Sequence, residues 1–95
     1  MAGINFSAFE ALSVGTTAVS FTAATYAQAD AAFVYVESGN VRVRFDGTAP
    51  TSTTGWQLFG GEVWEFENAR ELADAQFISG DGSTYTLQVN YGVRQ

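Results

Sequence analysis

The stretch that decides the fold is residues 41–66, VRVRFDGTAPTSTTGWQLFGGEVWEF. It opens with Val41 to Phe45, where apolar and arginine residues alternate with the two-residue period of a strand that buries one face. A Thr- and Gly-rich loop follows, in which Asp46-Gly47 predicts a turn and Pro50 excludes a helix. The stretch therefore predicts β structure. It also raises the question of whether its loop binds a partner or only joins strands.

The rest of the chain continues this pattern. The further predicted strands cover residues 16–22, 32–37, 56–59, 62–67, 76–79 and 84–93. Short strands separated by turn signals every 8–12 residues are typical of a sandwich or a barrel. We therefore expect an all-β fold, a small jelly-roll-like β-sandwich of seven to eight strands, with residues 15–95 forming one domain.

Two segments depart from this strand pattern. Asn68, followed by Glu71 three positions later, predicts a helix start and one short helical turn near residues 68–75. Residues 1–14 are apolar without a clean period, at Phe6, Phe9, Leu12 and Val14. This N-terminal segment is either a first strand or an arm that docks on a neighbouring subunit.

Residues 32–37 and 41–45 together predict a β-hairpin around Gly39-Asn40, because both loop residues tolerate positive φ. That register pairs Glu37 with Arg42 and Tyr35 with Arg44. The predicted outward face carries Phe33, Tyr35, Glu37, Arg42 and Arg44. Such a face either forms a protein interface, where aromatic residues and arginine are enriched, or only stabilises the hairpin through cross-strand pairs.

The composition excludes several functions. The 95-residue chain has four arginines, no lysine and a net charge of −6, which disfavours nucleic acid and anionic membrane surfaces as partners. It has no cysteine and no histidine, so it lacks disulfides, the commonest general base and the commonest transition-metal ligand. The N-terminus has no basic segment before an apolar one, so we expect no signal peptide and no membrane span.

The remaining side-chain patterns give weak support to catalysis or to a cofactor. Glu65 and Glu67 share one strand face, but hydrolytic carboxylate pairs normally face each other across a cleft. Asp46 and Asp81 each sit in a glycine turn and offer too few oxygens for a calcium ion. We expect no enzyme activity, no metal and no cofactor. A pair of tryptophans, Trp56 and Trp64, forms either a sugar-stacking platform or part of the core.

The loop motif also carries a family resemblance. VRVRFDGTAPTSTTG at residues 41–55, then LFGGEVWEF, ARELADAQFI and the closing LQVNYG, resembles small virion proteins of tailed phages and prophages. The resemblance spans roughly residues 33 to 91, and the loop motif is its more specific part. The absence of lysine and the acidic balance are departures that place contact with packaged DNA in doubt.

The resemblance implies a non-enzymatic virion component, foremost a capsid decoration (cement) protein on the outer surface of the head, made in the host cytoplasm. The expected partners are the major capsid protein lattice and sister subunits, with a trimer suited to local three-fold positions. Other phage roles (tail, adaptor or fibre) and a carbohydrate- or host-receptor-binding module remain as alternatives. The candidate interface residues are Phe33, Tyr35, Arg42, Arg44, Asp46, Thr48 and Pro50.

Overall fold

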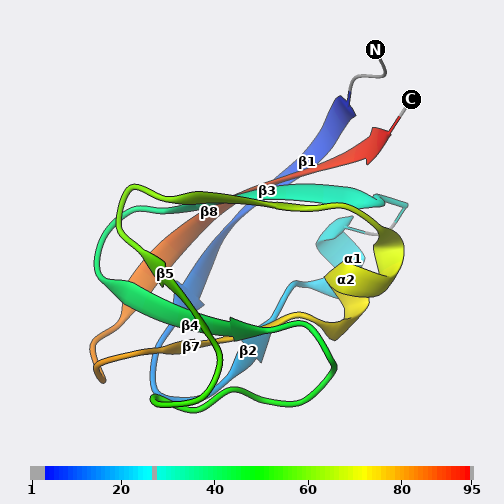
Figure 1. Ribbon diagram of the computed structural model, residues 1–95. Coiled ribbons are helices and arrows are strands. Elements are labelled where there is room, and N and C mark those ends of the chain that lie inside the picture. The colour runs from blue at the N-terminus through cyan, green and yellow to red at the C-terminus, as the bar shows by residue number, and fades with distance from the viewer. Residues whose placement is uncertain (1–3, 27, 95) are drawn as a thin grey trace.

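The protein folds into two four-stranded antiparallel sheets packed face to face, as the computed structural model in Figure 1 shows. The structure describes residues 4–26 and 28–94. Residues 1–3, which belong to the expected N-terminal segment, lie outside the described residues. The predicted all-β sandwich of seven to eight strands is confirmed, and the described residues form eight.

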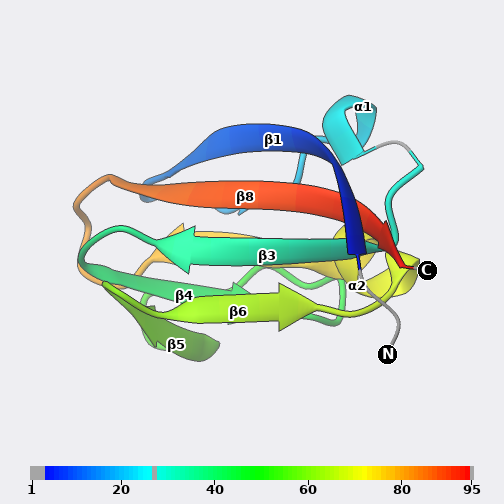
Figure 2. The same ribbon diagram turned by 90° about the horizontal axis from the view of Figure 1, so that it is seen from above.

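Sheet A takes its strands from both ends and the middle of the chain. Its order is β1 (Ile4–Val14), β8 (Tyr85–Arg94), β3 (Ala31–Val36) and β6 (Val63–Phe66), which Figure 2 shows from above. The order of sheet B is β2 (Val19–Ser20), β7 (Gln76–Ser79), β4 (Asn40–Arg44) and β5 (Trp56–Phe59). β2 is shorter than the strand predicted over residues 16–22.

The strand order is that of a jelly roll. The paired strands are β1 with β8, β2 with β7, β3 with β6 and β4 with β5, as in one long ribbon folded at the β4–β5 loop. When this ribbon is rolled up, successive strand pairs belong to alternate sheets. The pairing of β3 with β8 completes sheet A, and the pairing of β4 with β7 completes sheet B.

The predicted hairpin between β3 and β4 is wrong. β3 lies between β8 and β6 in sheet A, whereas β4 lies between β7 and β5 in sheet B. Both strands still turn their valines to the core, since Val34 and Val43 are fully or almost fully buried. Face alternation tells which side of a strand is buried, and that side is the same whether two strands lie side by side or face each other across the core.

The core lies between the sheets and is rich in aromatic rings. On β8 the alternating residues Leu87, Val89 and Tyr91 are buried, as their spacing predicts. Phe21 packs edge-on against Phe66, Phe77 and Tyr91, with ring centroids 5.1–5.5 Å apart. These edge-to-face contacts fix the distance and the rotation between the two sheets.

Residues 4–14 form strand β1, which pairs with β8 along its whole length. Of the two alternatives for this segment, a first strand or a docking arm, the described residues therefore form the first strand. The register shifts by one residue between Phe6 and Ala8, as in a β-bulge. The bulge turns Phe6 and Phe9, three positions apart, to the same outer side of sheet A. It also explains why the sequence of this segment has no clean period.

Two short helices lie at the same end of the sandwich (Figures 1 and 2). The predicted helical turn is α2 (Ala69–Asp74), where the Asn68 side chain accepts a hydrogen bond from the Glu71 amide at 2.9 Å. Its Leu72 is buried in the core. The segment before β3 was expected to be a turn and contains the one-turn helix α1 (Ala23–Tyr26).

A polar network attaches α1 to sheet A. Glu10 accepts hydrogen bonds from the Thr22 amide at 3.1 Å and the Thr22 hydroxyl at 2.7 Å, and the Tyr91 hydroxyl donates a third. Burial, and then the bond to Glu10, raise the pKa of the Tyr91 phenol above its usual value. Tyr91 is therefore a neutral donor that ties the core to the surface carboxylate.

Candidate interaction surfaces

The residues expected to form one interface lie on two different sheets. Phe33 and Tyr35 lie on β3 of sheet A, whereas Arg42 and Arg44 lie on β4 of sheet B. The continuous aromatic–arginine face that the hairpin predicted is therefore absent from the described structure. Asp46, Thr48 and Pro50 follow β4 and belong with the sheet B group. The two groups make separate surfaces with different properties.

On sheet B, the loop over residues 45–55 folds back along the outer side of the sheet (Figure 1). Arg42 holds it there, because its Nε donates to the Ser52 carbonyl and its Nη1 to the Gly55 carbonyl, both at 2.9 Å. Pro50 is buried by this arrangement. The guanidinium of Arg42 is thus used within the chain, and the loop is a folded cover of sheet B.

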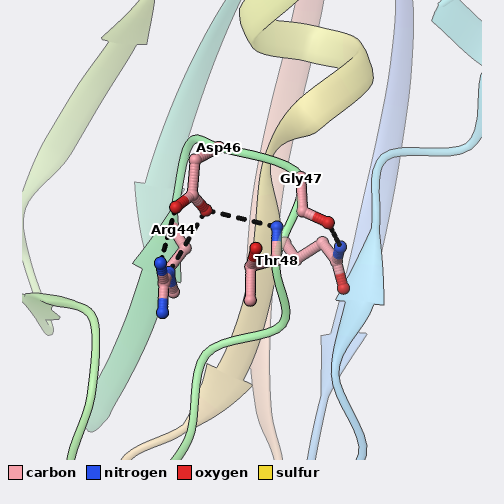
Figure 3. A network of polar contacts seen from close by, with 5 residues as sticks. Arg44, Asp46, Gly47 and Thr48 are labelled. Atoms are coloured by element: carbon pink, nitrogen blue, oxygen red, sulfur yellow. Dashed lines mark hydrogen bonds and ion pairs between the residues drawn. The ribbon is translucent and has the colours of Figure 1, made fainter.

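Arg44 holds the start of the same loop, as Figure 3 shows. It forms a two-pronged ion pair with Asp46, whose carboxylate also accepts from the Thr48 amide at 3.2 Å. The bond to Arg44, then that to Thr48, lowers the pKa of Asp46 below its usual value of 3.8. On the other side of the turn, the Gln76 side chain donates to the Gly47 carbonyl at 3.0 Å. Asp46 is therefore a charged residue that stabilises the turn, and Thr48 remains exposed to solvent.

A hollow of about 540 Å³ lies beside this loop. Its lining includes Pro50 and Ser52 of the loop, Ile78 and the residue 79–82 turn. In that turn, the buried Ser79 hydroxyl accepts from the amides of Asp81 and Gly82. The Asp81 carboxylate accepts from the Ser83 amide and the Tyr85 hydroxyl, which lowers its pKa. Turn geometry accounts for these polar groups.

The outer side of sheet A is different, because it displays aromatic and apolar side chains to solvent. Its exposed members come from β1, β3 and β6, and Phe6 contacts Phe33 edge-on at 5.6 Å between ring centroids. We call this surface the aromatic face; its members are Phe6, Phe9, Phe33, Tyr35 and Val63. Sequence reasoning found Phe33 and Tyr35 but missed the other three.

The register shows how the members of the aromatic face lie relative to one another. Phe6 contacts Phe33 across Gly92 of β8, the exposed Asn90 of β8 lies between Phe9 and Phe33, and Tyr35 lies opposite Val63. The exposed fractions are 55% for Phe9 and 58% for Val63. Side chains of this size and exposure present an apolar patch of roughly 300–400 Å². A patch of that size on a monomer often marks an interaction site.

The polar groups that border the aromatic face are acidic or neutral. Glu65 and Glu37 lie on its β6 side and at one end of β3, and the Gln88 side chain donates to the Glu37 carboxylate. Of the arginine side chains that the structure describes, Arg42 and Arg44 lie on sheet B and Arg70 on α2. The charged side chains that the structure describes around this face are therefore acidic.

A second exposed aromatic site lies at the edge of sheet B. Trp56 on β5 is 61% exposed, so it is not a core tryptophan, and its ring lies 6.0 Å from the half-buried ring of Trp64. A hollow of about 330 Å³ opens beside it. We call it the Trp56 hollow; it is lined by Val43, Arg44, Phe45, Asp46, Gly55 and Trp56.

The carboxylates form no metal site among the described residues, where no group of three or more His, Cys, Asp or Glu could hold an ion. Glu65 and Glu67 border a hollow of about 200 Å³ together with Glu71 and two aromatic rings. The Glu71 carboxylate accepts from the Glu67 amide at 2.7 Å and so belongs to the helix start. Within residues 4–26 and 28–94, no helix has the length and apolar character needed to cross a membrane.

Comparison with known proteins adds no relative from which a role could be transferred. No family model, no curated protein and no solved structure matches the chain. The surfaces described above are therefore the features of this protein that bear on its function.

Proposed function

We propose that this protein is a structural subunit of a tailed-phage particle, namely a capsid decoration protein that binds the outside of the assembled head. The observation that carries the proposal is the aromatic face, an exposed, largely apolar surface on sheet A of a chain that has no histidine, cysteine or lysine. The jelly roll is a fold that viral capsid domains and lectins use, so it adds only an analogy.

The size of the aromatic face suits such a contact. A standard interface buries roughly 800 Å² on each partner, a little over half of it apolar. The patch of Phe6, Phe9, Phe33, Tyr35 and Val63 would supply most of that apolar part. Phe and Tyr are also enriched at the buried centres of protein interfaces, and Tyr is among the residue types that contribute most to binding energy there.

The charge around the aromatic face favours a capsid surface over a second copy of this chain. Two copies joined through this face would bring Glu37 and Glu65 of each into the same interface, and like charges there oppose association. A partner with an apolar centre and a lysine- or arginine-rich border would complement it. The net charge of −6 fits the outside of the shell and not the packaged DNA.

Repetition of the binding sites would compensate for a modest affinity at each one. A shell presents many identical sites in symmetric positions, so a decoration protein needs no tight single contact. We include in the proposal that copies gather around local symmetry axes, with a trimer at three-fold positions as the arrangement to be tested.

The test mixes purified protein with undecorated shells of its own phage, pellets the shells and counts bound copies per shell. We expect saturation at a copy number set by the lattice symmetry. Phe9→Ser combined with Tyr35→Ser should weaken binding by about 100-fold, as loss of two well-buried aromatic contacts would.

The matched control is Phe59→Ser, which removes an aromatic side chain that is 48% exposed on sheet B. This variant should bind shells like the unmodified protein. Failure to bind intact shells, combined with binding to isolated tails, would replace decoration with a tail, adaptor or fibre role. Equal binding by all variants would refute the aromatic face as the contact.

A further inference from the structure

The Trp56 hollow combines an exposed indole with a rigid aromatic support. Behind Trp56 lies Trp64, whose ring is 5.8 Å from that of Phe45, and Phe45 in turn packs 5.6 Å from the buried Phe66. Rings in contact from the core to the surface restrict the movement of the outermost one. Trp56 therefore presents a positioned flat surface beside the hollow.

The polar side of the hollow is also held in place. Arg44 uses its Nε and one Nη2 proton on Asp46, so three of its five N–H groups make no bond among the described residues. The two side chains are 31% and 55% exposed. The lining of the hollow thus includes an ion pair with unused donors, its carboxylate acceptor and an indole.

This combination fits a neutral sugar better than an ion or a lipid. One face of a pyranose ring carries C–H groups that stack on an indole, while its hydroxyls both donate and accept hydrogen bonds. The Arg44–Asp46 pair supplies both kinds of partner. Because Asp46 balances the charge of Arg44, the hollow gives no strong attraction to an anion.

From this geometry we infer that the Trp56 hollow is a binding site for one or two units of a neutral oligosaccharide, stacked on Trp56 and hydrogen-bonded by Arg44 and Asp46. Its volume of about 330 Å³ is at the small end of ligand sites, and its lining of an aromatic ring with few polar groups is usual for them. The site lies on sheet B, so it leaves the aromatic face of sheet A available. The inference does not depend on the proposed capsid role.

The test titrates the isotope-labelled protein with neutral hexasaccharides of glucose, mannose and N-acetylglucosamine at millimolar concentration. We follow backbone amide and indole N–H signals by NMR. At least one sugar should shift the Trp56 indole signal together with the amides of residues 44–46 and 55. Trp56→Ala should abolish binding, and Arg44→Lys should weaken it about tenfold, because lysine keeps the charge but loses the paired donors.

Two controls separate the hollow from a general effect. Phe9→Ser, on the other sheet, should bind the sugar unchanged, and a proline decapeptide tests whether the indole recognises a peptide instead. The inference is overturned if none of the sugars shifts the Trp56 signal, if Trp56→Ala binds as well as the unmodified protein, or if only the proline peptide binds. If Trp56→Ala does not fold, the Arg44→Lys titration decides.

Discussion

The outer sides of the two sheets differ in whether another part of the chain covers them. On sheet B, a loop of the chain itself covers the strands, and Arg42 donates its hydrogen bonds to that loop. On sheet A, no described segment covers the strands (Figure 1). Phe6, Phe9 and Val63 of this sheet face solvent. The predicted hairpin had suggested that arginines and aromatic residues form one contact surface. The difference teaches that a side chain is available to a partner only where its own chain has not already used it.

Among substitutions that test how the loop packs on sheet B, the largest loss of stability is expected at Gly55, where the loop returns to the sheet. Gly55 has φ of +135°, and an added Cβ would lie 3.1 Å from the Pro50 Cβ and 3.2 Å from the Val43 carbonyl. Gly55→Ala should lower the free energy of unfolding by about 3 kcal/mol, measured by urea denaturation. Gly61→Ala is the control: φ is +91° and nothing lies within 4 Å, so backbone strain alone should cost about 1 kcal/mol. Equal losses would mean that the loop does not pack on sheet B as described.

A smaller loss is expected when the arginine that holds the loop is removed. Arg42→Ala leaves the Ser52 and Gly55 carbonyls without their charged donor and should cost about 2 kcal/mol. It should also speed proteolysis within residues 48–54. Arg70→Ala is the matched control, because its ion pair with Asp74 is on an exposed helix and should contribute about 0.5 kcal/mol or less. An Arg42→Ala protein as stable as the control would restore Arg42 as a candidate contact residue.

Substitutions on the aromatic face, unlike those in the loop, should change the free energy of unfolding very little. Phe9→Ser removes a side chain that is already 55% exposed, so the free energy of unfolding should change by about 0.5 kcal/mol, as for most surface substitutions. Thermal unfolding of this variant measures the change directly. A loss above 2 kcal/mol would show that Phe9 stabilises β1, and the aromatic face would then need no partner to explain it.

The smallest effect is a pH dependence at the Arg44–Asp46 pair. The pKa of Asp46 is lowered, so its stabilising contribution is fully present above the ordinary value of 3.8 and is lost as the pH falls through the lower folded value. Carbon NMR of the Asp46 carboxyl should give a midpoint below 3.8, and Arg44→Ala should move it upward. A midpoint at or above the ordinary value in the unmodified protein would contradict the two-pronged ion pair.

Much of the fold could be predicted from local patterns. The strands at residues 56–59 and 76–79 and the cap at Asn68 were predicted from alternation and capping residues, because these signals act within a few positions. The partners of β3 and β4 could not be predicted, since alternation is identical for strands in one sheet and for strands in facing sheets. Strand pairing here is decided between segments far apart in the chain.

The candidate surfaces could be predicted only in part. Phe33 and Tyr35 were placed outward correctly, because β3 alternates without interruption. Phe6 and Phe9 were missed because the bulge of β1 breaks the alternation on which that reasoning depends. The role of Arg42 was missed because its partners are loop carbonyls, which no sequence pattern marks.

The nested strand pairs also determine how the chain folds. Joining β4 to β5 closes only the loop between residues 44 and 56, whereas joining β1 to β8 brings together residues from the two ends of the described chain. Because longer loops cost more entropy to close, we expect the pairs to form outward from β4 and β5, with β1 and β8 last. A topology so rich in non-local pairings folds in milliseconds to seconds. In that order the pairing of β4 with β5 comes first. Arg42 would favour this pairing, on which the later ones depend, because it holds the residue 45–55 loop closed.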